Sequence, residues 1–226
     1  MNKYLVSSII IFGIFIVFTL VIYNDIIELN DYSSEGSLIY EFDTGIMQAR
    51  SYFFSSVTTE IMNILSDFGR EYFWIIVPIL LFVFGGIDGR IAAITILISF
   101  ILVIPLTTLV KDLVDRDRPH VYYETSVNKL PVDESYPSGH ASMVSAGALA
   151  ALFSLRNCPR QKLISSLLVI EAGLVCLSRL YLGVHYPTDL IGGILLGSGA
   201  ALLVTSAHKM IERLVKLKIR LQLIEP

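Results

Sequence analysis

Residues 163–204 read LISSLLVIEAGLVCLSRLYLGVHYPTDLIGGILLGSGAALLV, two long apolar runs joined by a short polar connection. Each run is long enough to cross much of a bilayer, where about 20 apolar residues form a spanning helix. The connection carries Arg179, His185 and Asp189. Charged groups beside a membrane core are costly unless they are paired or used. The stretch therefore predicts a helical membrane protein with a functional site where two of its helices meet.

The composition of the whole chain points to the same class. Of the 226 residues, 54% are hydrophobic and only 16% are charged, and the mean hydropathy is +0.68. A soluble domain carries about 25% charged residues. Cys158 and Cys176 lack a metal-binding spacing, so we interpret them as unpaired packing residues. The chain is predicted to be an integral membrane protein.

Six segments approach the length of a membrane span. They are residues 4–23, 72–84, 91–110, 141–155, 163–180 and 190–207. The second and fourth are short as apolar runs, so we expect them to extend into their polar flanks. Only Lys3 precedes the first run and no A-x-A site follows it, which favours a retained anchor over a cleaved signal peptide. We predict an all-α, polytopic fold of six transmembrane helices in one domain, residues 1–226.

The distribution of charge orients this topology. With a cytoplasmic N-terminus, the inner side holds ten basic residues against three acidic ones, whereas the outer side holds seven basic and 16 acidic residues. Lysine and arginine are enriched in the cytoplasmic loops of membrane proteins. We therefore expect both termini in the cytoplasm and the polar connection of the opening stretch on the extracytoplasmic side.

Residues 44–69 do not form a span. Apolar side chains recur there at helical spacing, while the remaining positions are mostly polar. This pattern predicts one extracytoplasmic amphipathic helix. Two placements fit it equally well: a helix lying on the outer membrane surface, or a helix packed on the end of the bundle.

The opening stretch has the pattern of an oriented nucleophile. Pro187 is well placed in a first helical turn, so His185 precedes a helix N-terminus and Asp189 follows four residues later. A carboxylate at this spacing accepts a hydrogen bond from one imidazole nitrogen and leaves the other free to attack. His185 and Asp189 are therefore candidate catalytic residues.

A second motif, YPSGHASM at residues 136–143, predicts an anion site. Ser138, Gly139 and His140 fall at a helix N-terminus, where free backbone N–H groups and the helix dipole favour negative charge. Gly139 allows close approach of a ligand to the backbone. His140 is placed to give a proton to a leaving group.

A third motif, KDLVDRDRP at residues 111–119, supplies cations. Lys111 and Arg118 are seven residues apart, so they share one helix face. Arginine offers a planar fork for phosphate oxygens, and lysine offers a compact charge. We interpret Arg116 and the acidic residues around it (Asp112, Asp115 and Asp117) as a solvated face or local ion pairs.

In order and spacing, the three motifs resemble those of the type 2 phosphatidic acid phosphatases, membrane lipid phosphatases that share a site with vanadium haloperoxidases. Eleven positions match the family pattern: Lys111, Arg118, Pro119, Pro137, Ser138, Gly139, His140, Ser178, Arg179, His185 and Asp189. The resemblance is strong over the last four predicted helices and implies a catalytic core at about residues 91–207. Within the family, the length and six-helix plan of this chain are most similar to those of bacterial phosphatidylglycerophosphatases of the B type. This similarity implies a location in the bacterial cell membrane.

The resemblance implies a role for each residue of the site. His185 would be the nucleophile that forms a phosphohistidine, Asp189 would orient it, and His140 would protonate the leaving oxygen. The groups expected to bind the phosphate are Lys111, Arg118, Ser138, Gly139 and Arg179. It also implies no metal or cofactor, and a lipid phosphate and membrane lipids as partners, without nucleic acid.

The substrate stays open between two classes of lipid. Phosphatidylglycerol phosphate is the first candidate, and the alternative is undecaprenyl diphosphate in cell-wall carrier recycling. The choice is expected to depend on residues 120–136, which include Tyr122 and Tyr123, and on the interfacial segment. We expect the lipid to reach the site through a lateral opening between helices.

Two further readings are disfavoured. A haloperoxidase is disfavoured because it would be soluble. An anionic-lipid binding protein or transporter is disfavoured because it would need no paired histidines.

Three other polar residues are set apart from this site. Glu171 lies near the middle of a span and is either structural or part of the substrate cavity. His120 and His208 are interpreted as structural.

Overall fold

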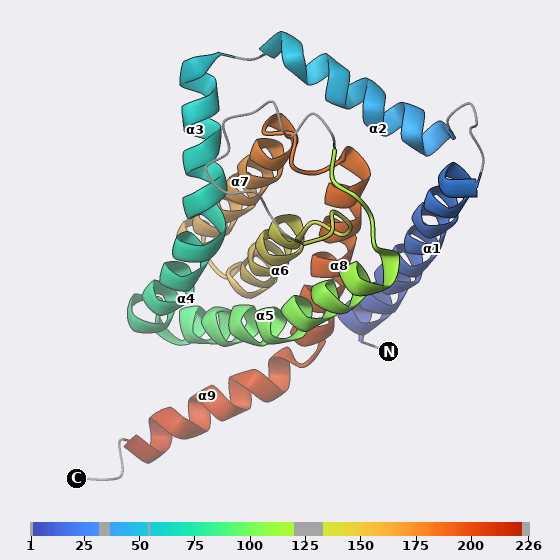
Figure 1. Ribbon diagram of the computed structural model, residues 1–226. Coiled ribbons are helices and arrows are strands. Elements are labelled where there is room, and N and C mark those ends of the chain that lie inside the picture. The colour runs from blue at the N-terminus through green and yellow to red at the C-terminus, as the bar shows by residue number, and fades with distance from the viewer. Residues whose placement is uncertain (1, 32–36, 54, 120–132, 223–226) are drawn as a thin grey trace.

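The computed structural model describes residues 2–31, 37–53, 55–119 and 133–222, and in these ranges all regular structure is helical (Figure 1). The helices are α1 (Lys3–Asp31), α2 (Leu38–Ala49), α3 (Ser56–Asp67), α4 (Phe73–Phe84), α5 (Gly86–Val114), α6 (Gly139–Ser154), α7 (Pro159–Tyr181), α8 (Pro187–Ser206) and α9 (His208–Gln222). A 3₁₀ turn (Arg50–Phe53) follows α2, and a π-helical turn (Phe68–Tyr72) joins α3 to α4. The predicted all-α class is confirmed.

All six segments predicted as spans are helical, but they differ in length. Four helices in the described part of the chain, α1, α5, α7 and α8, are long and apolar enough to cross a membrane. α4 has 12 residues and α6 has 16. Large apolar side chains point outward from the bundle, as with Ile9 on α1 and Ile101 on α5, which are 62% and 74% exposed. These features are those of a multi-pass membrane protein.

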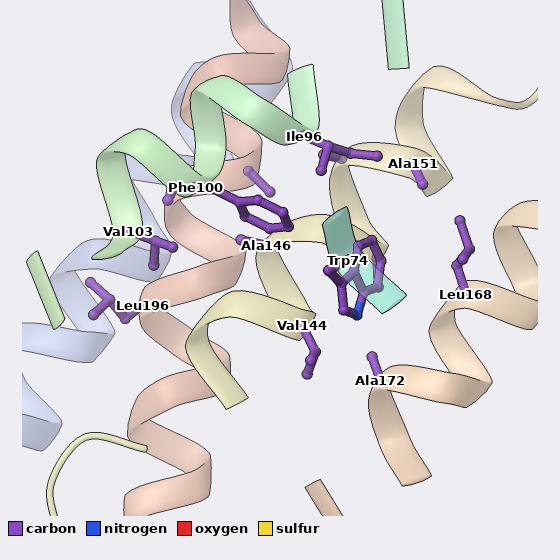
Figure 2. Close-up of a cluster of buried hydrophobic side chains, with 14 of the residues drawn as sticks. Trp74, Ile96, Phe100, Val103, Val144, Ala146, Ala151, Leu168, Ala172 and Leu196 are labelled. Atoms are coloured by element: carbon purple, nitrogen blue, oxygen red, sulfur yellow. The ribbon is translucent and has the colours of Figure 1, made fainter. Parts of the chain in front are cut away.

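Helix α6 occupies the centre of the bundle, between α5, α7 and α8 (Figure 1). Small residues allow this placement: a β-carbon added at Gly197 of α8 would lie 2.1 Å from the Ser142 carbonyl oxygen of α6. Trp74 of α4 fills the other side of α6 and packs edge-to-face on Phe100 with ring centroids 6.0 Å apart (Figure 2). α6 is thereby packed closely against α8 at Ser142 and against α4 at Gly147.

The single amphipathic helix predicted for residues 44–69 is wrong in its bounds, because the structure has two helices there. α2 ends at Ala49, and α3 begins at Ser56. Ser55 is the reason for the second start, since its Oγ accepts a hydrogen bond from the Thr58 N–H at 3.1 Å and so caps α3. In Figure 1, α2 crosses one end of the bundle and α3 runs into α4.

The order of the helices brings four helix ends together. α5 ends, α6 begins, α7 ends and α8 begins on one side, because consecutive helices run in opposite directions. The opposite side is marked by hydrogen bonds from Asn2 to the Ser206 carbonyl (2.6 Å) and from Asn157 to Asp88 (2.9 Å). α9, which the sequence reading did not anticipate, leaves this opposite side (Figure 1). The three sequence motifs therefore meet at one end of the bundle.

Candidate active site

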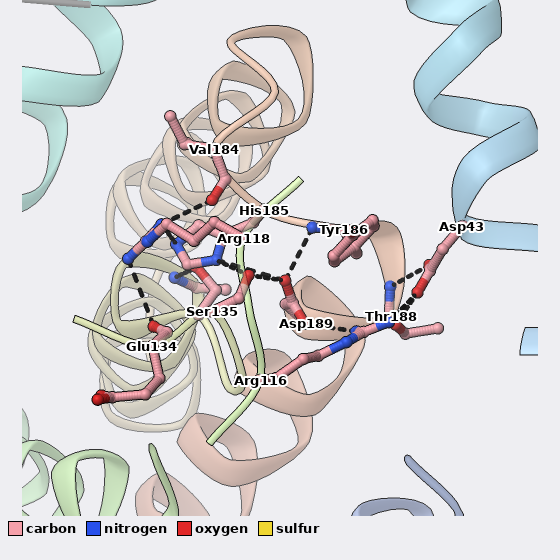
Figure 3. A network of polar contacts seen from close by, with 12 residues as sticks. Asp43, Arg116, Arg118, Glu134, Ser135, Val184, His185, Tyr186, Thr188 and Asp189 are labelled. Atoms are coloured by element: carbon pink, nitrogen blue, oxygen red, sulfur yellow. Dashed lines mark hydrogen bonds and ion pairs between the residues drawn. The ribbon is translucent and has the colours of Figure 1, made fainter. Parts of the chain in front are cut away.

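His185 lies in the connection between α7 and α8 and is only 1% exposed. Gly183, at φ +71°, makes the turn after α7, a conformation that glycine adopts without strain. The His185 Nδ1 atom is 3.5 Å from Asp189 Oδ2 and 3.4 Å from Ser135 Oγ (Figure 3). Ser135 uses its own hydroxyl proton to donate to Asp189 Oδ2 at 2.5 Å. Ser135 Oγ and Asp189 Oδ2 can therefore both accept from a proton on His185 Nδ1. This arrangement leaves the Nε2 lone pair on the side of the ring away from Asp189.

The Nε2 atom of His185 faces the guanidinium group of Arg118. Its distance to Arg118 Nη1 is 3.3 Å, and the same Nη1 donates to the Val184 carbonyl at 2.6 Å. Burial lowers the pKa of His185 to about 3, against the opposing hydrogen bond with Asp189. The imidazole is therefore uncharged at neutral pH, as a nucleophile must be.

The PSGH motif forms the N-terminal turn of α6, as predicted. Ser138 is the N-cap residue, and its Oγ accepts a hydrogen bond from the Ala141 N–H at 3.4 Å. The Ser138 N–H donates to the Asp189 carbonyl oxygen at 3.0 Å, which joins this turn to the start of α8. His140 follows, with its Nδ1 atom 3.3 Å from Arg70 Nη1. The two histidines thus lie on adjoining helix ends.

The prediction that Lys111 and Arg118 share one helix face is wrong, because α5 ends at Val114 and Arg118 lies in the chain after it. The two side chains nevertheless share one carboxylate. Asp133 Oδ2 is 2.8 Å from Lys111 Nζ, and Asp133 Oδ1 is 2.9 Å from Arg118 Nη2. Partial burial would raise the pKa of Asp133, but the two cations outweigh it and hold that pKa at about 2. The predicted phosphate-binding cations therefore converge on an anionic group, here a carboxylate of the chain itself.

Arg179, at the end of α7, completes the group of cations. Its side chain is buried and donates a hydrogen bond to Ser66 Oγ of α3. Its charge lies close enough to act on both His185 and His140. The structure thus brings all eight predicted site residues to one place: Lys111, Arg118, Ser138, Gly139, His140, Arg179, His185 and Asp189.

The interpretation of Arg116 as part of a solvated face or of local ion pairs is wrong. Its side chain is buried and donates to Asp189 Oδ1 at 2.6 Å, Thr188 Oγ1 at 2.8 Å and Asp43 Oδ2 at 2.7 Å (Figure 3). The guanidinium also lies 4.3 Å from the ring centroid of Tyr186. Arg116 therefore connects α2, through Asp43, to the carboxylate that contacts His185.

The remaining residues singled out in the sequence lie away from this centre or outside the described part. Asp112, Asp115 and Asp117 are exposed, as expected. Glu171 Oε2 accepts a hydrogen bond from Trp74 Nε1 at 3.0 Å. Cys158 and Cys176 are free thiols. His120, Tyr122 and Tyr123 fall outside the described residues.

Sequence reasoning missed five polar residues of the site: Asp43, Arg70, Arg116, Asp133 and Ser135. Only Arg116 had a local signal, since it lies two positions before Arg118 in the same motif. Asp43 and Arg70 come from segments whose pattern shows no chemistry, and Asp133 and Ser135 from residues 120–136, where only a role in the choice of lipid was expected. Within the described ranges, no group of three or more His, Cys, Asp or Glu side chains has the arrangement of a metal site.

Comparison with known proteins adds an independent observation. The profile of the PAP2 superfamily matches residues 91–213. An undecaprenyl-diphosphatase from Sulfolobus acidocaldarius is 40% identical over 163 residues, which cover 69% of this chain and 76% of that protein. Phosphatidylglycerophosphatase B from Bacillus subtilis is 31% identical over 116 residues, 48% of this chain and 54% of that one.

A solved structure is similar over nearly the whole fold. It is a transmembrane PAP2-type phosphatidylglycerolphosphate phosphatase from Bacillus subtilis, with a TM-score of 0.68 over 93% of this chain and 98% of that one. At 23% identity, this likeness concerns the fold.

Proposed function

This chain belongs to the PAP2 superfamily of phosphatases, and from that premise we propose that it removes the terminal phosphate of a membrane lipid through a phosphohistidine at His185. One observation carries the proposal. His185 Nδ1 faces the Asp189 carboxylate while its Nε2 faces Arg118, 3.3 Å away. This chemistry requires a nucleophile whose attacking nitrogen is oriented toward a phosphate-binding cation.

In the first step, the Nε2 lone pair of His185 attacks the terminal phosphorus and forms the N–P bond. The P–O bond to the lipid breaks, and its electron pair stays on the leaving oxygen, which receives a proton from His140. The proton on Nδ1 stays directed at Asp189, whose negative charge stabilises the imidazolium that develops. Charge on the three equatorial oxygens is met by Lys111, Arg118 and Arg179 together with the Gly139 N–H and the Ser138 hydroxyl.

In the second step, water attacks the phosphohistidine. His140 accepts a proton from the water, the N–P bond breaks with its electron pair returning to Nε2, and inorganic phosphate leaves. The fixed cations serve both steps, because the same three oxygens carry charge in each transition state. We propose on this ground that the reaction needs no metal ion, since three buried or half-buried cations already surround the phosphate.

Two lipid classes remain candidates for the substrate. Phosphatidylglycerol phosphate is supported by the likeness to phosphatidylglycerophosphatase B, and undecaprenyl diphosphate is supported by the more similar undecaprenyl-diphosphatase. Both carry a terminal phosphate on a long apolar chain. The eight predicted site residues contact only that phosphate in this mechanism, so they serve either lipid.

The site is proposed to lie on the extracytoplasmic side of a bacterial cell membrane, with both termini in the cytoplasm. α6 would be a short span shielded at the bundle centre, and α4 would be lengthened by α3 through the π-helical turn, which gives six spans. The basic residues of α9 and of the α6–α7 connection support this orientation. Single-cysteine labelling at residue 112 and residue 210 with a membrane-impermeant reagent tests it, because only residue 112 should react in intact cells.

The activity is tested with the purified protein in detergent with EDTA present. Release of inorganic phosphate from phosphatidylglycerol phosphate and from undecaprenyl diphosphate is compared by kcat/KM, with His185→Ala as the control. We expect release by the unaltered chain and none by the variant. Near-normal release by His185→Ala would contradict the mechanism, and loss of activity in EDTA that a divalent metal restores would contradict its metal independence.

A further inference from the structure

Arg70 lies in the π-helical turn Phe68–Tyr72, outside the three motifs. Such turns change the direction of side chains along a helix and are frequent at functional sites. Here Phe68 and Tyr72 are 55% and 58% exposed on the outside, whereas Arg70 reaches inward until its Nη1 is 3.3 Å from His140 Nδ1. The turn therefore places the Arg70 guanidinium beside His140, from a segment that carries none of the three motifs.

A groove of about 430 Å³ between α4, α5 and α6 runs past this cation. Arg70, Lys111 and Asp133 line its polar part, with Asp133 paired to Lys111, and apolar side chains that include Ile75, Ile104 and Met143 line the rest. Ile75 and Ile104 are 59% and 52% exposed on the outer surface of the bundle. The groove thus fits a lipid whose chain follows the apolar wall and whose charged end lies between the two cations.

Arg70 and Arg118 contact different histidines of the site. Arg118 contacts the nucleophile His185, whereas Arg70 contacts His140, the group assigned to the leaving oxygen. Arg70 also lies beside the N-terminal turn of α6, because a β-carbon added at Gly139 would be 3.9 Å from its Nη1. A cation at this position meets the leaving group, whereas Arg118 meets the transferred phosphate.

We propose that Arg70 binds the second phosphate of a lipid diphosphate and so makes diphosphates the preferred substrate class. This inference rests on the proposed function and selects between its two lipids. An alcohol ester leaves as a neutral alcohol, which offers no charge to Arg70. A diphosphate leaves as a phosphate monoester with about −1.5 to −2 charges at neutral pH, which Arg70 is placed to bind.

The contact between Arg70 and His140 agrees with the same assignment. A guanidinium only donates hydrogen bonds, so His140 Nδ1 accepts the contact, and His140 must release Arg70 before the ring can carry the second proton that it gives to an alcohol leaving group. When the bridging P–O bond of a diphosphate breaks, the electron pair goes to an oxygen of the departing phosphate. That group is a stable anion with a pKa of about 6, so it departs without full protonation, whereas an alkoxide requires a proton.

The test uses two substrates that differ only in the second phosphate, farnesyl diphosphate and farnesyl monophosphate. kcat/KM is measured on both for the unaltered chain, Arg70→Gln, Arg70→Lys and the control Lys111→Gln. We expect Arg70→Gln to lower the diphosphate-to-monophosphate ratio by about 30-fold, the loss of one charge-assisted contact. Arg70→Lys should restore most of the ratio. Lys111→Gln should lower both rates and leave the ratio within about threefold, since Lys111 serves the phosphate common to both.

The outcomes separate this inference from the function on which it rests. An unchanged ratio in Arg70→Gln, or a ratio lowered equally by Lys111→Gln, overturns the role of Arg70. If the unaltered chain releases phosphate from neither substrate, the proposed function is overturned instead. If Arg70→Gln does not fold, inhibition of the unaltered chain decides: methylenediphosphonate should bind at least about tenfold more tightly than methylphosphonate, and equal binding overturns the inference.

Discussion

At the scale of the residue, the protonation state of His185 is the first feature to test. Burial lowers its pKa from 6.5 to about 3, so the folded chain stays unprotonated there while the unfolded chain binds a proton below about pH 6.5. The free energy of unfolding is therefore highest above pH 6.5, and the protonation of His185 in the unfolded chain lowers it progressively as the pH falls toward 3. We expect the histidine NMR signal that disappears in His185→Gln to show no titration between pH 5 and 8. A midpoint near 6.5 would contradict the burial of an uncharged nucleophile.

Asp133 is a second residue with a consequence for the reaction. Its carboxylate forms ion pairs with Lys111 and Arg118, and its pKa of about 2 keeps it charged at any working pH. In the proposed mechanism, the substrate phosphate must displace this carboxylate. Asp133→Asn should therefore lower the inhibition constants of phosphate and vanadate by about three- to tenfold, measured by competition assays. The exposed Asp112 provides the control, and weaker inhibition in Asp133→Asn than in Asp112→Asn would contradict this competition.

At the scale of the element, Arg116 links α2 to the start of α8. It bridges Asp43 and Asp189, and Asp189 contacts His185. Because Arg116 acts through Asp189 and does not contact the substrate in this mechanism, Arg116→Lys should lower kcat by about 10- to 100-fold with KM changed less than about threefold. Steady-state kinetics measure both constants. A rise in KM with normal kcat would assign Arg116 to substrate binding instead.

The close contact between α6 and α8 sets the position of the PSGH turn. A β-carbon at Gly197 would meet the Ser142 carbonyl oxygen at 2.1 Å, whereas a β-carbon at Gly13 of α1 would have no neighbour within 4 Å. Gly197→Ala should therefore destabilise the fold by about 1–3 kcal/mol. Thermal unfolding in detergent measures this. Equal melting temperatures for Gly197→Ala and the control Gly13→Ala would contradict the packing.

The helices themselves follow from hydrophobic runs, but their breaks do not. The six predicted spans are all helical, because an apolar run in a membrane has few other ways to satisfy its backbone. The division between α2 and α3 depends on one cap, Ser55, inside a segment whose apolar period continues across it. The π-helical turn at Phe68–Tyr72 has no signature that periodicity could reveal.

At the scale of the whole molecule, sequence reasoning predicted the residues of the three motifs but not the polar residues around them. Lys111, His140 and His185 could be assigned because their motifs carry fixed spacing. Arg70 and Asp43 could not, because they come from separate helices and reach the site only through the tertiary fold. The residues of the three motifs, Asp189 and His140 included, were therefore visible in the sequence, whereas the residues that contact them from other segments required the structure.

The most direct test of the central claim is detection of the covalent intermediate. The purified chain is mixed with undecaprenyl diphosphate or phosphatidylglycerol phosphate, quenched in alkali within milliseconds and digested for mass spectrometry. We predict a phosphate on His185 that is absent from His185→Ala. It should accumulate in Asp189→Asn or His140→Ala where the change slows hydrolysis of the intermediate more than its formation. Phosphate release without any phosphohistidine, or with the phosphate on another residue, would contradict the account.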